Sequence, residues 1–545
     1  MMNLKSIVLL ILILFVGCNT PIQPSKPKLV VGIVVDQMRM DYLTRFENHF
    51  GNEGFKRFYR EGFVAKNHHF DYAQTKTGPG HASISTGTPP AIHGIIGNDW
   101  FDKATGGGQY CVDDASYQGV GTSTNAGKKA PTQLLVSTFS DENRLATQSR
   151  GKAIGVSIKD RGAILSIGHA ANGAYWFSGN DEGNFVSSTF FMDALPQWAA
   201  DFNASRVIDK YLSTWDTYYP AESYVETGLD NTPYERIAPG KETPTFPYDL
   251  AAAAKQLGYD VLKPTPFGNS LITDFALAAL EGEHLGTDAD ADVLMVSYSS
   301  TDYVGHAFGV NAKELQDTYV RLDMDLARLF AALDKQVGKG NYTVFLTSDH
   351  GVAHVPQYLT DNKIPAGYFK KKDFKSELKN RIADYFGSDE LIRNVSNNEI
   401  YLNHEKIATE RLDAAQIKAF ITSFTTSYTG IAAAYDTNEL MKMNENNAII
   451  ERLQRGFHPK RSGDIVFILE PGFMDNGKYG KKGTTHGSAY IYDTHVPLML
   501  YGEGVRKGTT FERTNITDIA PTICAILGIS NPTGTIGNPI KEVLK

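Results

Sequence analysis

The sequence predicts an α/β fold with a mainly parallel central sheet. Short apolar runs rich in branched side chains have the length and composition of buried parallel strands. Segments with helical periodicity lie between them, and apolar side chains recur at helical spacing over residues 314–334, which indicates a core helix. Alternation of this kind favours an α/β architecture. The predicted strands are residues 28–36, 153–161, 291–302, 342–351 and 495–502.

The first residues are typical of an export signal. One lysine precedes a continuous apolar stretch of roughly ten residues, too short for a membrane span. The stretch ends in FVGC, which is similar to a bacterial lipobox and would make Cys18 a lipidated N-terminus; the alternative is an ordinary signal peptide cut a few residues later. We expect a signal peptide over 1–17 and a proline-rich tether over 18–27. The protein would then be exported, either periplasmic or anchored by lipid, with the outer membrane as the expected location.

Composition limits the classes of function. With 42% hydrophobic and 21% charged residues, the chain can bury a sizeable core. Its 53 basic and 61 acidic side chains give a net charge of -8, which offers no electrostatic footprint for a nucleic-acid polymer. Beyond Cys18 only Cys111 and Cys524 occur, so at most one internal disulfide can form. A bound metal would therefore need histidine and carboxylate ligands.

Acidic side chains stand where three of the predicted strands stop. Asp36 closes the first strand, Asp302 follows the third, and Asp349 with His350 follows the fourth. Ligands of open α/β sheets bind outside the carboxyl ends of the strands, so these segments are expected to converge on one crevice. The alternative for each aspartate is a helix cap or a salt-bridge partner.

Histidines accompany these aspartates at spacings that suit a metal. Asp302 and His306 are four residues apart in an expected loop that contains glycine, and Asp349 and His350 are adjacent. His486 lies in a Gly/Thr-rich loop, where an apolar core is not expected. Aspartate and histidine together suit zinc. Each match is weak alone, and the prediction depends on their joint placement.

A hydroxyl group precedes a Gly-Pro-Gly turn in the segment TKTGPGHASISTG. Pro79 suits the first turn of a helix, and the neighbouring glycines allow close backbone approach. If a helix begins here, its N-terminal amides would face an anionic group beside Thr77. Thr77 is thus a candidate nucleophile; the alternative is a simple helix cap.

Several sequence motifs of the chain resemble those of a known protein superfamily. VVDQMRMDYL, TGPGHASISTGTPPAIHGIIGNDW, STDYVGH, TSDHG, GTTHG and TDIAPTICAILGI resemble, in order, those of the alkaline phosphatase superfamily. The similarity is greatest to flavobacterial PafA-type alkaline phosphatases, which are related to nucleotide pyrophosphatase/phosphodiesterases. It implies a three-layer α/β sandwich over residues 28–545, with lid insertions around 170–265 and 360–465.

The resemblance also implies the roles of single residues. Thr77 matches the nucleophile and would contact the first zinc, and Asn98 matches an asparagine that donates a hydrogen bond to a phosphoryl oxygen. Zinc would stabilise the threonine alkoxide, and a second zinc would stabilise the leaving alkoxide and then activate water to hydrolyse a phosphothreonine intermediate. The two Zn²⁺ ions would be held by Asp36, Asp349 and His350, and by Asp302, His306 and His486.

Two cations separate the possible substrates. Lys159 and Arg161, in IKDR, are two residues apart at an expected strand end, where both side chains can project to one face. A phosphate monoester is a dianion and would gain more from two cations than a diester. The pair also matches the PafA-type monoesterases, although in isolation it reads as a solvated turn. We therefore predict a monomeric, secreted two-zinc phosphomonoesterase that hydrolyses a broad range of small phosphate monoesters at alkaline pH.

Other functions stay open at this stage. A phosphodiesterase or nucleotide pyrophosphatase would use the same zinc ligands and Thr77 but is expected to lack the Lys159 and Arg161 pair. A sulfatase is weaker, because that branch is expected to use a nucleophile derived from cysteine or serine. A surface lipoprotein that binds a ligand without catalysis is the non-enzyme alternative.

Overall fold

The computed structural model describes residues 26–180, 183–444, 446–475 and 480–545. The predicted signal peptide and Cys18 lie outside the described residues. Among the residues described, no helix is both long and apolar enough to span a bilayer. The other two cysteines, Cys111 and Cys524, are buried and free, so the possible disulfide between them is not formed.

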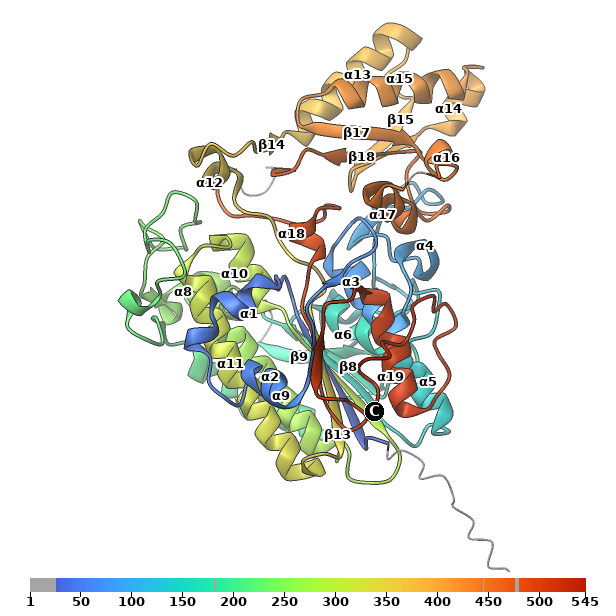
Figure 1. Ribbon diagram of the computed structural model, residues 1–545. Coiled ribbons are helices and arrows are strands. Elements are labelled where there is room, and N and C mark those ends of the chain that lie inside the picture. Colours follow the sequence, from blue (N-terminus) through green and yellow to red (C-terminus); the bar gives the residue numbers. More distant parts are fainter. Residues whose placement is uncertain (1–25, 181–182, 445, 476–479) are drawn as a thin grey trace, which may run out of the picture.

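A ten-stranded sheet forms the centre of the molecule (Figure 1). Its five middle strands, in the order β13, β1, β12, β7 and β8, are all parallel, which confirms the predicted mainly parallel sheet. They span Tyr342–Thr347 (β13), Leu29–Val35 (β1), Asp292–Tyr298 (β12), Ala153–Ser157 (β7) and Gly173–Ser178 (β8). Every residue of β1 is buried, because both faces of the sheet are covered.

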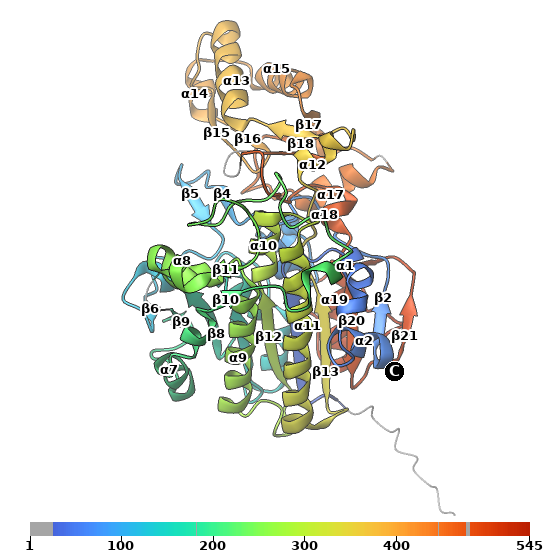
Figure 2. The ribbon, with the colours of Figure 1, turned by 90° about the vertical axis from the view of Figure 1, so that its left-hand side faces the viewer.

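Helices cover both faces of this sheet, so the domain has three layers (Figures 1 and 2). The side chains of β1 alternate between two cores: Val31 and Ile33 pack with the helices of one face, and Val30 and Val34 with those of the other. The first face carries α9 (Pro266–Gly282) and α11 (Lys313–Leu333), where the predicted core helix is found; the second carries α3 (Thr77–Thr86), α6 (Asp160–Ile167) and α19 (Ile519–Leu527).

One predicted parallel strand has the opposite direction. β20 (Leu498–Gly502) is antiparallel to β13, although residues 495–502 were expected to be parallel. The reason is the route of the chain: Gly351, just beyond the carboxyl end of β13, donates its N–H to the carbonyl of Asp493 at 2.7 Å. The chain therefore enters β20 from the edge at which β13 ends. β20 also pairs with β2 (Phe63–Ala65), and β21 (Gly508–Thr510) pairs with the other side of β2.

A second, smaller unit stands above the carboxyl edge of the sheet in Figure 1. Its antiparallel sheet contains β15 (Ile392–Ser396), β16 (Glu399–Leu402), β18 (Ile465–Leu469) and β17 (Ile431–Asp436). The helices α13 (Lys371–Phe386) and α15 (Ala414–Ser427) pack on it around a core of its own, which includes Phe374 and Ile417. The tight turn between β15 and β16 carries Asn397 and Asn398, both at positive φ.

The long connection between β9 (Asn184–Ser188) and α9 wraps one end of α11. The buried carboxylate of Asp317 on α11 anchors it, accepting hydrogen bonds from Trp215 Nε1 at 2.8 Å and from the Tyr224 hydroxyl at 2.7 Å. Arg321, one turn further on, donates to the same carboxylate at 2.8 Å. This connection supplies one wall of the larger cavity described below.

Candidate active site

The first group of converging side chains follows β1 and β13. Asp36, Asp349 and His350 are fully buried, and their side-chain ligand atoms lie within 4.8 Å of one another. His350 Nε2 is 3.4 Å from Asp36 Oδ1 and 3.6 Å from Asp349 Oδ2. In the described part of the chain, none of these three atoms has a hydrogen-bond partner. Buried and unpartnered carboxylate and imidazole atoms facing one another fit a metal ion.

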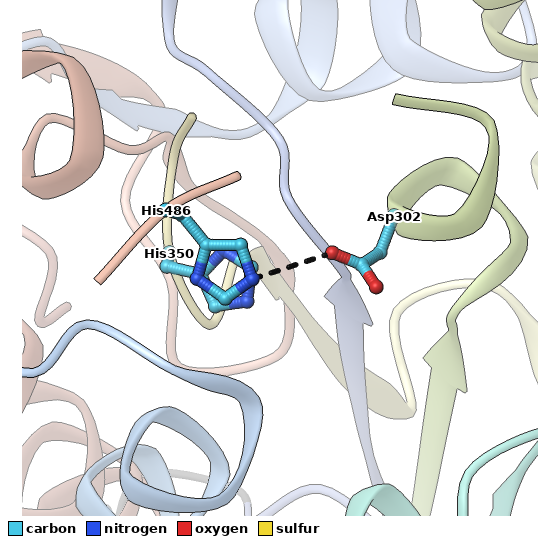
Figure 3. Close-up of side chains that lie close together, drawn as sticks. All are labelled: Asp302, His350 and His486. Carbon is cyan, nitrogen blue, oxygen red and sulfur yellow. Dashed lines mark ion pairs between the residues drawn. The ribbon is translucent and has the colours of Figure 1, made fainter. Parts of the chain in front are cut away.

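The second group shares His350 with the first (Figure 3). Asp302 and His486 join it, with 3.6 Å between His486 Nε2 and Asp302 Oδ1. The imidazole rings of His350 and His486 are stacked, with 3.4 Å between their centroids. His306 lies beside this group, its Nε2 atom 3.2 Å from Asp302 Oδ1. The structure thus brings all six predicted ligands to one place: His306 contacts Asp302, and the centroid of its ring lies 5.2 Å from that of His486.

Asp302 and His306 lie on a helix, whereas a loop was expected. They are four residues apart on α10 (Ser300–Phe308), so both project from the same face. Glycine is required at position 305 of this helix, because a Cβ atom there would collide with the Gln37 side chain. The His306 ring is held from the far side, since Nδ1 lies 2.7 Å from the Thr484 carbonyl.

Burial and charge set the protonation of these groups. Burial, followed by the charge of Asp349, raises the pKa of Asp36 to about 7, and burial lowers the pKa of His350 to about 4. Burial would also raise the pKa of Asp302, but His306 and Lys159 outweigh it and hold that pKa well below its usual range. Burial therefore favours the neutral imidazole of His350, the form that donates a lone pair to a metal.

Thr77 begins α3 and is 1% exposed. Its hydroxyl oxygen is 3.3 Å from Lys159 Nζ, and the next residue, Gly78, donates its N–H to Asn98 Oδ1 at 2.8 Å. His81 lies one turn later, with Nδ1 2.9 Å from the Thr77 carbonyl and 3.4 Å from Asp349 Oδ2. The start of this helix is therefore fixed beside the first group of ligands.

Lys159 and Arg161 were expected at the end of a strand, but neither lies in one. β7 ends at Ser157, Lys159 precedes α6, and Arg161 lies in its first turn. Lys159 Nζ donates to Asp36 Oδ2 at 2.7 Å and to Asp302 Oδ2 at 2.6 Å, so it bridges the two groups of ligands. Arg161 donates to the Tyr110 hydroxyl at 2.8 Å.

Two further residues orient the ligands, and the sequence analysis missed both. Gln37, at positive φ directly after Asp36, donates its backbone N–H to Asp349 Oδ1 at 3.1 Å and its side-chain amide to Asp302 Oδ1 at 2.6 Å. Asp493 accepts the N–H groups of the two residues after His486 and so fixes that loop. The position of Gln37 beside a strand-end aspartate was a usable signal, whereas nothing local marks Asp493.

Two cavities adjoin the site. The larger, of about 730 Å³, is lined by Lys159, Arg161 and His306 and by aromatic side chains that include Trp215 and Tyr248. The smaller, of about 290 Å³, is lined by Lys76, His486 and the Asn397 turn of the second unit. A substrate would therefore be enclosed by segments that are far apart in the sequence.

Buried Asp and His side chains at the carboxyl ends of parallel strands, beside a hydroxyl group at a helix N-terminus, define a metal-dependent hydrolytic site on an α/β fold. Comparison with known proteins identifies the family. The family model for type I phosphodiesterase/nucleotide pyrophosphatase matches residues 30–489. The chain belongs to this family.

Several relatives are similar over nearly the whole chain. A protein named calcium-transporting ATPase from Myroides odoratus is 45% identical over 96% of this chain and 95% of its own length. Alkaline phosphatase PafA of Elizabethkingia meningoseptica is 41% identical over 95% of each chain. Alkaline phosphatase PhoV of Synechococcus elongatus is 44% identical over 96% of this chain and 94% of its own. A crystal structure of PafA matches with a TM-score of 0.92, covering 95% of this chain and 99% of that chain.

Proposed function

We propose that this chain, a phosphate monoester hydrolase of the alkaline phosphatase type, transfers a phosphoryl group to Thr77 and then to water. The observation that carries the proposal is the position of the Thr77 hydroxyl, at the start of a helix and 3.3 Å from a lysine that bridges two groups of buried ligands. The relatives named alkaline phosphatase support the choice of substrate class.

The metal ions would be two Zn²⁺. Asp36, Asp349 and His350 would hold one, and Asp302 and His486 with His306 would hold the other. The unpartnered carboxylate and imidazole atoms of the first group fit such an ion. Bound zinc supplies Lewis acidity, which lowers the pKa of a hydroxyl group or water and stabilises a leaving oxygen.

The chain's own groups position the substrate. The positive end of the α3 dipole favours an anion beside Thr77, and Lys159 with Arg161 would bind the nonbridging oxygens of the dianion. Asn98, whose amide oxygen accepts from Gly78, would donate its NH₂ group to a phosphoryl oxygen.

In the first step the bond from phosphorus to the Thr77 oxygen forms, the bond to the leaving oxygen breaks, the hydroxyl proton passes to solvent, and the leaving oxygen takes up a proton from solvent. Water then attacks the phosphothreonine, releases inorganic phosphate and restores the hydroxyl group.

The test compares an aryl phosphate monoester with the matching methyl aryl diester. We expect zinc-loaded wild-type protein to prefer the monoester, and the Lys159→Ala/Arg161→Ala variant to lose mainly that activity. Lys370→Met, which removes one exposed cation from the second unit, is the control. A preference for the diester that the double substitution leaves unchanged would mean a phosphodiesterase, the activity that the family description also names.

Thr77→Ala tests the covalent step. The variant should keep its zinc content and lose the phosphoenzyme that wild type accumulates under acid quench with labelled substrate. Wild-type turnover by purified Thr77→Ala protein would remove the nucleophile from the mechanism.

Export, lipid attachment at Cys18 and a monomeric state belong to the same proposal. FVGC supports the lipid. Tyr248 and Asn397, which line the two cavities, support the lid assignment for residues 170–265 and 360–465, except that β8 and β9 at the start of the first segment belong to the central sheet. Labelling of cells with a fatty acid should mark wild type and not Cys18→Ser, and light scattering should give the mass of one chain.

A further inference from the structure

The smaller cavity beside the site is built by two separate parts of the fold. One wall is the segment before Thr77 together with the His486 loop, and the other comes from the second unit through Asn397 and Lys371. Its volume of about 290 Å³ is enough for a small charged group and several waters. Since His486 lines it and belongs to the second group of metal ligands, the cavity adjoins the site.

Lys76 places a positive charge in this cavity. It is the residue before Thr77, and its Nζ donates to the amide oxygen of Asn397 at 2.6 Å. Across the described ranges, no carboxylate lies within 4.0 Å of this nitrogen; the neighbouring Lys371, by contrast, is paired with Asp475 at 3.1 Å. A largely buried ammonium group without a counter-ion is unfavourable, and an anionic ligand would relieve that cost.

Hydrogen bonds hold the turn that carries Asn397 against the segment that precedes Thr77. The side-chain amide of Asn397 donates to the Asp99 carbonyl at 2.6 Å, and the backbone carbonyl of Asn397 accepts from Gln74 Nε2. Both Asn397 and Asn398 are left-handed, a conformation that asparagine tolerates better than most residues. These contacts fix Lys76 Nζ in the cavity before a ligand arrives, which reduces the entropy lost on binding.

We propose that this cavity is an anion subsite for the leaving group, so that the enzyme favours phosphate monoesters whose leaving group carries a second negative charge. The inference rests on the proposed function, because the phosphoryl group must lie at Thr77. Lys159 and Arg161 line the larger cavity, and Lys76 and His486 line the smaller one. The phosphoryl oxygens therefore go to Lys159 and Arg161, and the leaving group extends towards Lys76.

Two substrates of equal size separate charge from shape: 4-carboxyphenyl phosphate and its neutral counterpart, 4-carbamoylphenyl phosphate. The measured quantity is the ratio of their kcat/KM values in zinc-loaded protein. We expect Lys76→Met to lower this ratio about tenfold or more, as for loss of one charge-assisted contact. The neutral ester should be hydrolysed nearly as in wild type, and Lys76→Arg should keep the ratio. Lys370→Met is the control for a general loss of positive charge.

An unchanged ratio in Lys76→Met, with the neutral ester still hydrolysed, overturns the subsite and leaves the proposed function intact. If wild type hydrolyses neither ester, both proposals fail. Should Lys76→Met lose activity on both esters, Asn397→Asp decides, because it keeps Lys76 and places a carboxylate at its amide partner. A lower ratio in Asn397→Asp supports the subsite, and an unchanged ratio overturns it.

Discussion

Gly80 lies where α3 passes closest to a predicted metal ligand. A Cβ atom at this position would be 2.7 Å from the Cβ atom and 2.9 Å from the carbonyl carbon of Asp349. Carbon atoms in contact are about 3.5–4.0 Å apart, so in Gly80→Ala the helix must retreat from Asp349 by about 1 Å. Thr77 starts the same helix and would move with it.

The size of the effect follows from two opposing terms. Alanine favours a helix over glycine by about 1 kcal/mol, whereas overpacking costs about 1–3 kcal/mol, so stability should fall by at most about 2 kcal/mol. A misplacement of about 1 Å at the nucleophile can cost about 100-fold in kcat/KM. Gly80→Ala should therefore stay folded and lose most of its activity.

The assay measures kcat/KM for an aryl phosphate, bound zinc by elemental analysis, and the midpoint of thermal unfolding. Gly108→Ala is the matched control, because a Cβ atom there meets no other atom within 4 Å. If Gly80→Ala keeps activity within threefold of the control, the contact between α3 and Asp349 does not position the nucleophile, and the reasoning is refuted.

Three other outcomes are expected. Removal of metal by a chelator should abolish activity and lower the midpoint of thermal unfolding, because ligands that bind only the folded state stabilise it, and added zinc should restore both. Burial lowers the pKa of His93 from 6.5 to about 3, so the unfolded state binds an extra proton between these values. His93 should then contribute about 1.4 kcal/mol per pH unit to the fall in the free energy of unfolding as pH drops through this window, and in urea titrations the slope for His93→Gln should be smaller than that of wild type by this amount. Asp317→Ala removes the acceptor of the Trp215 and Tyr224 hydrogen bonds and should destabilise the protein by about 2–4 kcal/mol in the same titrations. A loss under about 0.5 kcal/mol would contradict the anchoring role.

Local pattern was sufficient for four of the five parallel strands and for the edge that carries the site, whereas β8 was not predicted. β1, β12 and β13 are continuous apolar runs, and Asp36 and Asp349 stand within two residues of where two of them end. Parallel strands bring such ends together whatever the sequence separation. The start of α3 at Thr77 was also marked locally, by Pro79 in the first turn.

Features that depend on tertiary contacts were not predictable. The apolar composition of β20 is the same for either direction, and only the path of the preceding chain decides that it is antiparallel. Gly305 lowers helix propensity in α10, and the Gln37 side chain that explains the glycine comes from a distant segment. The bridge from Lys159 to Asp36 and Asp302 likewise requires three separate segments to be placed first.

The position of β2 between β20 and β21 has a consequence for the order of folding. Residues 63–65 are made early, yet both of their sheet neighbours lie beyond residue 497. During synthesis this strand stays an unpaired edge until more than four hundred further residues have been added, and unpaired edges are prone to aggregation. Closing such long loops is also slow, because their entropy is lost before the contacts form. The enzyme should therefore fold late and as a whole, and a ribosome-bound chain that stops before residue 498 should remain sensitive to protease around β2.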